Sequence, residues 1–90
     1  MDEIYHQALK LLRRRDYTVA QLREKLETRF GEVPNDVIDK LLKKRFLDDT
    51  RYAGNFVVKR RDFHPSLVRE ELLNSGVSPD TAENVLSAND

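Results

Sequence analysis

Residues 18–31 read Thr-Val-Ala-Gln-Leu-Arg-Glu-Lys-Leu-Glu-Thr-Arg-Phe-Gly and carry the signals of a complete helix. Thr18 followed by Gln21 is a capping box, in which the hydroxyl accepts from a free N–H group and the amide reaches back to the cap. Gly31 can take the left-handed backbone conformation that commonly ends a helix. The apolar residues recur every three or four positions. This spacing predicts one buried stripe, made of Val19, Leu22, Leu26 and Phe30.

The same spacing continues on both sides of this segment, with no period-two alternation. It predicts a helix over 2–15, and further helices that start at Pro34, after Asp48, near Pro65 and at Pro79. Asp48 and Ser78 are predicted caps, and Pro34 and Pro79 suit a first helical residue. We therefore predict an all-α protein. Its inward residues are Ile4, Tyr5, Ala8, Leu11, Leu12, Val37, Ile38, Leu41, Leu42, Tyr52, Ala53, Phe56, Val57, Leu67, Val68, Leu72, Ala82, Val85 and Leu86.

The two halves of the chain resemble each other at an offset near 45 residues, through three helices in the same order. Such a period is typical of helical repeat arrays, whose units bury faces against one another. We predict two tandem three-helix repeats, 1–47 and 48–90, stacked into a short elongated array. Chance similarity between amphipathic helices is the alternative. The clearest match sets Ala8, Leu11, Leu12 and Arg15 against Ala53, Phe56, Val57 and Arg60.

The composition argues against an enzyme. The 90 residues include no Cys, two His and three isolated Gly, so disulfides, thiolate or His-rich metal sites and a phosphate-binding loop are not expected. Asp48-Asp49 could bind a metal, but adjacent helical residues diverge by about 100°, and an acid at a helix start caps free N–H groups. We expect no catalytic residue, cofactor or metal.

No long uncharged stretch lies near the middle of the chain, and the acidic opening Met1-Asp2-Glu3 is unlike a signal peptide. A cytoplasmic protein without a membrane contact is the expectation.

The net charge is zero but unevenly distributed. Residues 1–61 hold 15 Lys and Arg against 10 Asp and Glu, whereas residues 62–90 hold one Arg against six acids. An excess of cations over the first two thirds favours an anionic partner, and ordinary solvation of helix surfaces is the alternative. Helical facing selects the outward cations as candidate partner-binding residues: Arg13, Arg14, Arg51, Lys59 and Arg61.

Arg15 and Arg60 instead fall on the apolar side of their helices, one turn beyond inward residues. We interpret them as structural arginines, with a packed stem and the head on a carboxylate or a helix-end carbonyl. Tyr17 and Phe63 occupy equivalent repeat positions and are predicted to pack between helices.

The third helix could imitate a DNA-reading helix, because Lys40, Lys43 and Lys44 share one side. Asp36 and Asp39 stand four residues before Lys40 and Lys43, however, so the helix neutralises its own lysines. Sequence-specific groove reading is therefore not favoured.

Residues 46–53, Phe-Leu-Asp-Asp-Thr-Arg-Tyr-Ala, resemble the signature of the RecX family, regulators of the RecA recombinase. The likeness extends over essentially all of the chain. It falls on a set of motif residues: Arg15, Leu47, Asp48, Asp49, Tyr52, Ala53, Phe56 and Arg60.

The resemblance implies a monomeric, non-enzymatic protein that lies in the groove of the RecA–DNA filament. Such a protein inhibits strand exchange and ATP turnover in recombination and SOS repair, and single- or double-stranded DNA is a further possible partner. Two departures stand out. The family's third repeat is expected to be absent, as in a fragment or a naturally short member, and Arg45 replaces a frequent glycine before the aromatic residue. The alternatives are a stand-alone helical DNA-binding module with the same basic face and a helical scaffold for an unrelated partner.

Overall fold

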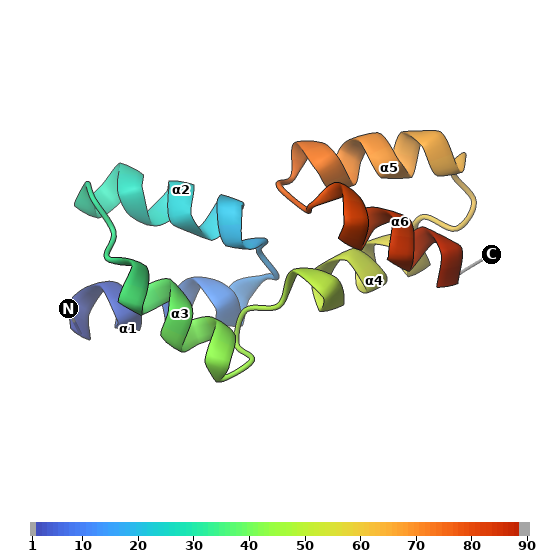
Figure 1. The fold of residues 1–90 in the computed structure, drawn as a ribbon. Coiled ribbons are helices and arrows are strands. Elements are labelled where there is room, and N and C mark those ends of the chain that lie inside the picture. The colour runs from blue at the N-terminus through green and yellow to red at the C-terminus, as the bar shows by residue number, and fades with distance from the viewer. Residues whose placement is uncertain (1, 89–90) are drawn as a thin grey trace. The chain divides into compact units, whose positions relative to one another are not determined.

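The computed structural model describes residues 2–88, and over these residues it contains six α-helices and no strand (Figure 1). The all-α prediction is confirmed. Met1, Asn89 and Asp90, which the predicted repeats include, lie outside the described residues. The helices are α1 (Asp2–Arg14), α2 (Val19–Phe30), α3 (Asn35–Lys43), α4 (Asp49–Lys59), α5 (Pro65–Asn74) and α6 (Pro79–Ala88).

The contacts within the chain divide it into two compact units of three helices each. The N-terminal unit is 1–48 with α1–α3, and the C-terminal unit is 49–90 with α4–α6. The division lies one residue after the boundary predicted from the repeat. Stacking of the repeats against each other stays a prediction.

In the N-terminal unit, α2 is held by the predicted capping box. The Thr18 hydroxyl accepts from the Gln21 backbone N–H at 3.1 Å, and the Gln21 side-chain oxygen accepts from the Thr18 N–H at 3.1 Å. Because these hydrogen bonds offset the desolvation of its polar groups, Thr18 can be fully buried. The core around it contains Ala8, Tyr17, Leu22, Leu26, Val33, Val37, Ile38, Leu41 and Leu47.

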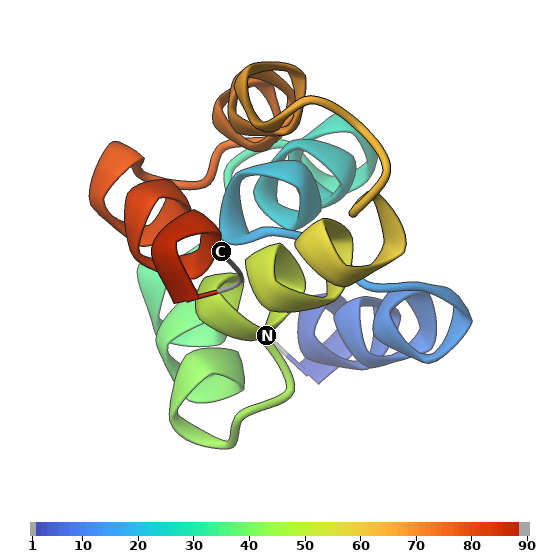
Figure 2. The same cartoon turned by 90° about the vertical axis from the view of Figure 1, so that its right-hand side faces the viewer.

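In the C-terminal unit, α6 contacts both α4 and α5 (Figure 2). Ala53 on α4 and Ala82 on α6 are fully buried, and such small side chains let two helices pack closely. The predicted Ser78 cap is confirmed, because its hydroxyl accepts from the Thr81 N–H at 3.2 Å. The core contains Ala53, Val57, Val68, Leu72, Val77, Ala82 and Val85.

Two leucines predicted to face inward, Leu42 and Leu67, are exposed instead. Each sits one position from a buried neighbour, Leu41 or Val68, and adjacent helical residues point about 100° apart. The buried neighbour therefore occupies the core side of the helix, and the leucine beside it does not.

Phe63 also departs from its predicted packing position. It is 55% exposed, whereas Tyr17, its predicted equivalent, is 7% exposed. The loop before α5 has one residue more than the loop before α2, which displaces Phe63 from the equivalent place.

One predicted helix start and the predicted conformation of one helix end also need correction. Pro34 is the cap of α3 with an extended ψ of 138°, so the helix begins at Asn35. Gly31 has the expected positive φ of 79°, but its ψ of −135° lies outside the left-handed helical region. That combination is reached almost only by glycine, so the residue type is still required there.

Two helices end in the same hydrogen-bond motif, with different residues at the left-handed position. After α5, the N–H groups of Gly76 and Val77 donate to the carbonyls of Leu73 and Leu72. After α3, the N–H groups of Arg45 and Phe46 donate to Leu42 and Leu41 in the same way. This is the Schellman pattern, in which glycine is preferred, yet Arg45 has a φ of 65°.

We expect Arg45→Gly to raise the free energy of unfolding by about 1 kcal/mol, because a left-handed conformation costs an L-residue about 1–2 kcal/mol. The ion pair lost with Asp48 spans 3.7 Å at the surface and contributes little. Urea denaturation measures the effect. Lys44→Gly is the control, since Lys44 has a φ of −86° and glycine there should destabilise. A loss of stability in Arg45→Gly would contradict this explanation of the turn.

Candidate partner-binding surfaces

The five candidate cations are all exposed, and they divide between the two units. Arg13 and Arg14 lie in the last turn of α1, and neither makes an ion pair with another described residue. Arg51 lies near the start of α4 and Lys59 at its end. Arg61 follows α4 and donates from Nε to the Val58 carbonyl at 3.3 Å. A single face that unites all five stays a prediction.

The two structural arginines have different surroundings. The guanidinium of Arg60 lies 3.7 Å from the centre of the Phe56 ring, and its Nε is 3.5 Å from a carboxylate oxygen of Glu71 on α5. Arg15 lies 4.7 Å from the ring centre of Tyr17 and donates to the Asp16 carbonyl just beyond α1. Arg60 is half-buried and links two helices, whereas Arg15 is exposed.

The family motif residues around the start of α4 lie in positions that suit core packing or the start of the helix. Leu47 is buried in the core of the N-terminal unit, and Asp48 directly precedes α4. Tyr52 and Phe56 stack with ring centres 6.1 Å apart, beside the buried Ala53. Asp49 is the first residue of α4, where a carboxylate complements the helix dipole.

Within residues 2–88, no three His, Asp or Glu side chains gather closely enough to hold a metal ion. None of the six helices in this range is long and apolar enough to cross a membrane.

We expect Arg60→Ala to lower the free energy of unfolding by about 1–2 kcal/mol, since it removes both the ring contact and the link to Glu71. Asp48→Ala should cost about 1 kcal/mol through the start of α4. Lys59→Ala, which lacks these contacts, should stay within about 0.5 kcal/mol. Thermal melts of the three variants check the ranking, and an unchanged Arg60→Ala would show that its stacking contributes nothing.

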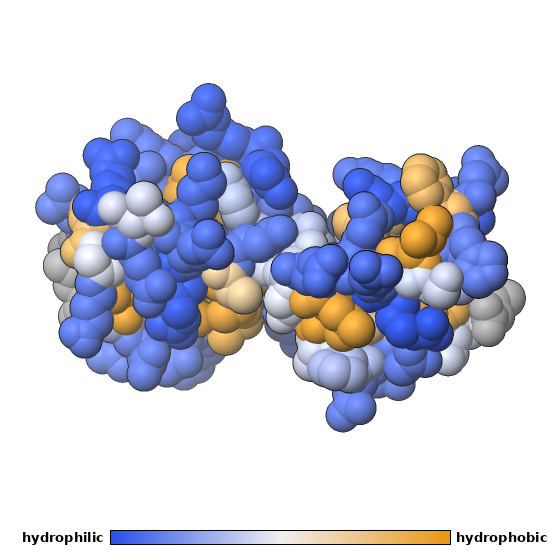
Figure 3. All heavy atoms as spheres, turned by 90° about the horizontal axis from the view of Figure 1, so that it is seen from above, coloured by the Kyte–Doolittle hydropathy of each residue, from blue (hydrophilic) through white to orange (hydrophobic). Residues whose placement is uncertain are grey.

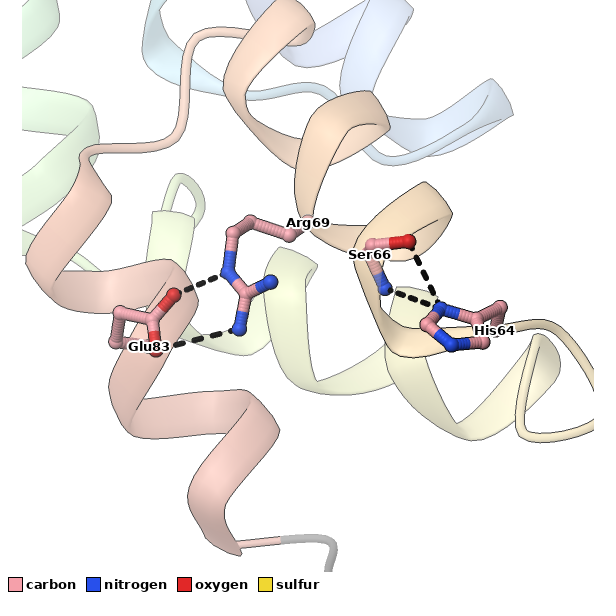
Figure 4. Close-up of polar contacts among 4 residues, drawn as sticks. All are labelled: His64, Ser66, Arg69 and Glu83. Atoms are coloured by element: carbon pink, nitrogen blue, oxygen red, sulfur yellow. Dashed lines mark hydrogen bonds and ion pairs between the residues drawn. The ribbon is translucent and has the colours of Figure 1, made fainter.

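Two polar contacts of the C-terminal unit were not predicted from the sequence (Figure 4). His64 caps α5, because its Nδ1 accepts from the Ser66 N–H at 3.1 Å. The guanidinium of Arg69 on α5 faces the carboxylate of Glu83 on α6, with Nη2 3.4 Å from Oε2 and Nε in contact with Oε1. The proline after His64 was the only signal for the cap, and no local pattern pairs residues 69 and 83.

The hydrogen bond to Glu83, with its charge, raises the pKa of Arg69 above its ordinary value. Because the pKa is raised in the folded state, the pair stabilises that state at any pH below the pKa that Arg69 has in the unfolded chain. This stabilisation is lost only as the pH rises through the pKa of the folded state. Because arginine is already charged throughout the physiological range, this pair gives no pH dependence there.

The lysines expected on one side of the third helix, Lys40, Lys43 and Lys44, are all exposed. The Lys40 ammonium lies 4.5 Å from the centre of the Tyr5 ring on α1 and is engaged within the N-terminal unit. That α3 does not read a DNA groove stays a prediction.

A hollow in the C-terminal unit was also missed. It lies where α4 ends, α5 begins and α6 ends, and its volume is about 220 Å³. Exposed Phe63 and Val58 line it beside Arg60 and Arg61. Sequence reasoning placed Phe63 in the core and so could not find it.

The two three-helix units define an all-α helical protein, and comparison with known proteins shows what it is similar to. The chain is 42% identical over 88% of its length to the regulatory protein RecX of Thermus thermophilus. It is 34% identical over 96% of its length to that of Legionella pneumophila, and 37% identical over 93% to that of Trichlorobacter lovleyi. Over most of its length the chain is thus similar to proteins of the RecX family.

The chain spans 57–60% of the length of these three relatives. No family model and no solved structure matches it.

Proposed function

We propose that this chain is a non-enzymatic regulator that binds the RecA–DNA filament and inhibits strand exchange and ATP turnover. The observation that carries the proposal is its 34–42% identity, over most of its length, to several proteins named regulatory protein RecX. RecA is the partner that this resemblance implies. The proposal includes a cytoplasmic location and action as a monomer in recombination and SOS repair.

The exposed cations of the two units support contact with an anionic partner. Arg13, Arg14 and Lys59 make no ion pair with any described side chain, so binding would not first require breaking one. Exposed charges of this kind act mainly on the association rate and on salt dependence. Exposed cations without an ion-pair partner suit a filament groove that contains DNA phosphate.

The same cations also favour the second candidate, a DNA-binding module that needs no RecA. Residues 1–61 hold five more Lys and Arg than Asp and Glu, which suits phosphate contact.

Cosedimentation separates the two candidates. The chain is mixed with RecA filaments on single-stranded DNA, with the naked DNA, or with RecA alone, at low and at moderate salt. We expect retention on the filament at both salt concentrations. Binding to naked DNA alone, lost steeply as salt rises, would support the second candidate and overturn the first.

A further inference from the structure

The hollow of the C-terminal unit combines an apolar floor with cations at its edge. Val57 and Val68 come from the core, and Pro65 and Leu86 extend the apolar lining. The space-filling view shows apolar surface among hydrophilic residues on this unit, at the right (Figure 3). An exposed apolar cluster bordered by charges is typical of an interaction site.

Two large apolar side chains of the lining are exposed. Phe63 is 55% exposed and Val58 is 47% exposed, although both line the hollow. An aromatic ring left this open is available to contact a partner, and aromatic residues are the common anchors of interfaces.

The charged residues that line the hollow have one sign. Two arginines, Arg60 and Arg61, are among the described lining residues, and none of these is acidic. Arg60 is paired with Glu71, whereas Arg61 and the neighbouring Lys59 have no carboxylate partner among the described residues. Uncompensated positive charge therefore borders the apolar floor.

The corresponding place in the N-terminal unit lacks this combination. A hollow there is lined by Arg15, Tyr17, Gln21, Glu24, Lys25 and Thr28, so both charges are present. Tyr17 is buried there, because the shorter loop places its ring in the core. The hollow at the corresponding place in the N-terminal unit therefore does not combine an exposed aromatic ring with a lining of purely positive charge.

We propose that this hollow docks an acidic peptide segment with one bulky apolar side chain, which packs against Phe63 and Val58 while carboxylates meet Lys59 and Arg61. Valines, a proline and a leucine suit an aliphatic or aromatic side chain, and single-stranded nucleic acid would need aromatic platforms for its bases, of which the lining has one. The inference does not depend on RecA.

The test uses a short fluorescent peptide with one central Phe between aspartates, and measures its fluorescence anisotropy with the 90-residue chain. We expect sub-millimolar binding that weakens about tenfold in Phe63→Ala, in Val58→Ser and in the double variant Lys59→Gln/Arg61→Gln. Only the charge variant should also lose the salt dependence. A peptide with alanine at its centre should not bind.

Leu67→Ala is the matched control. The exposed fraction of Leu67, 53%, is similar to that of Phe63, but Leu67 is not among the residues that line the hollow. Binding within about twofold of the unchanged chain is expected for this variant, because the exposed leucine lies outside the site. Helix content and melting temperature, measured for every variant, confirm that each one folds.

Four results would overturn the proposal. The first is no peptide binding at millimolar concentration, and the second is equal weakening by Leu67→Ala. The third is Phe63-dependent binding of labelled oligothymidine in place of the peptide, which would assign the hollow to nucleic acid. The fourth is sedimentation that shows a dimer abolished by Phe63→Ala, which would assign it to a second copy of the chain.

Discussion

Replacement of Arg13, Arg14, Lys59 and Arg61 by Glu is expected to abolish inhibition of RecA while the helix content stays unchanged. All four side chains are exposed, so their loss leaves the two cores intact. Reversing four charges that meet an anionic groove turns attraction into repulsion and slows association. The measurement is RecA-promoted strand exchange with increasing amounts of each variant.

Three of these cations lie in the last turn of a helix, where an acid also opposes the helix dipole at about 0.3–1 kcal/mol each. A second variant with Gln at the four positions removes the charge without that penalty. It should fold like the unchanged chain and lose most of the inhibition.

The control is a reversal of Lys40 and Lys43 on α3 and of Lys44 just after it. The smaller effect is expected, because Lys40 already contacts Tyr5 within the N-terminal unit. If this control abolishes inhibition and the four-site variant does not, α3 carries the interface and the assignment is wrong.

Leu72→Ala should have the largest effect on stability, a loss of about 2–5 kcal/mol. Leu72 is fully buried at the centre of the C-terminal core, and its carbonyl also accepts from Val77 in the turn after α5. At about 0.05–0.15 kcal/mol per residue, a unit of this size has only a few kcal/mol to lose. Far-UV circular dichroism at rising temperature should show partial loss of helix under conditions where the unchanged chain is folded.

Leu73→Ala, one position along, is the matched control. Leu73 is 40% exposed, so its truncation should cost less than about 1 kcal/mol. Leu41 and Leu42 give the same contrast in the N-terminal unit, because Leu41 is buried and Leu42 is exposed. Equal losses within either pair would contradict the assignment of core faces.

The helices were predictable because their signals are local. The capping box of Thr18 and Gln21, the Ser78 cap and the three-to-four-residue spacing each act within one or two turns. The structure confirms these features.

The errors in the predicted core residues arose in short helices, where only one stripe of apolar side chains is buried. In α3 and α5, Leu42 and Leu67 extend the apolar spacing but lie beside the stripe that the three-helix packing uses. Phe63 was misplaced because one additional loop residue breaks the equivalence of the repeats. Periodicity alone does not decide which of two adjacent apolar residues is covered, since that depends on the neighbouring helices.

The candidate site was predictable only as separate residues. Helical facing put Arg13, Arg14, Arg51, Lys59 and Arg61 at the surface, and all five are exposed. The Arg69–Glu83 pair joins residues 14 positions apart on different helices, so it depends on packing that no local pattern encodes. The hollow beside Phe63 was missed for the same reason.

The measurement that tests the central claim most directly is the DNA-dependent ATPase activity of RecA with this chain added. We predict that ATP turnover falls as the chain is added to RecA filaments on single-stranded DNA, and that the four-site Glu variant leaves turnover unchanged. Turnover that stays constant at a large excess of the folded chain would contradict the proposal that this chain regulates RecA.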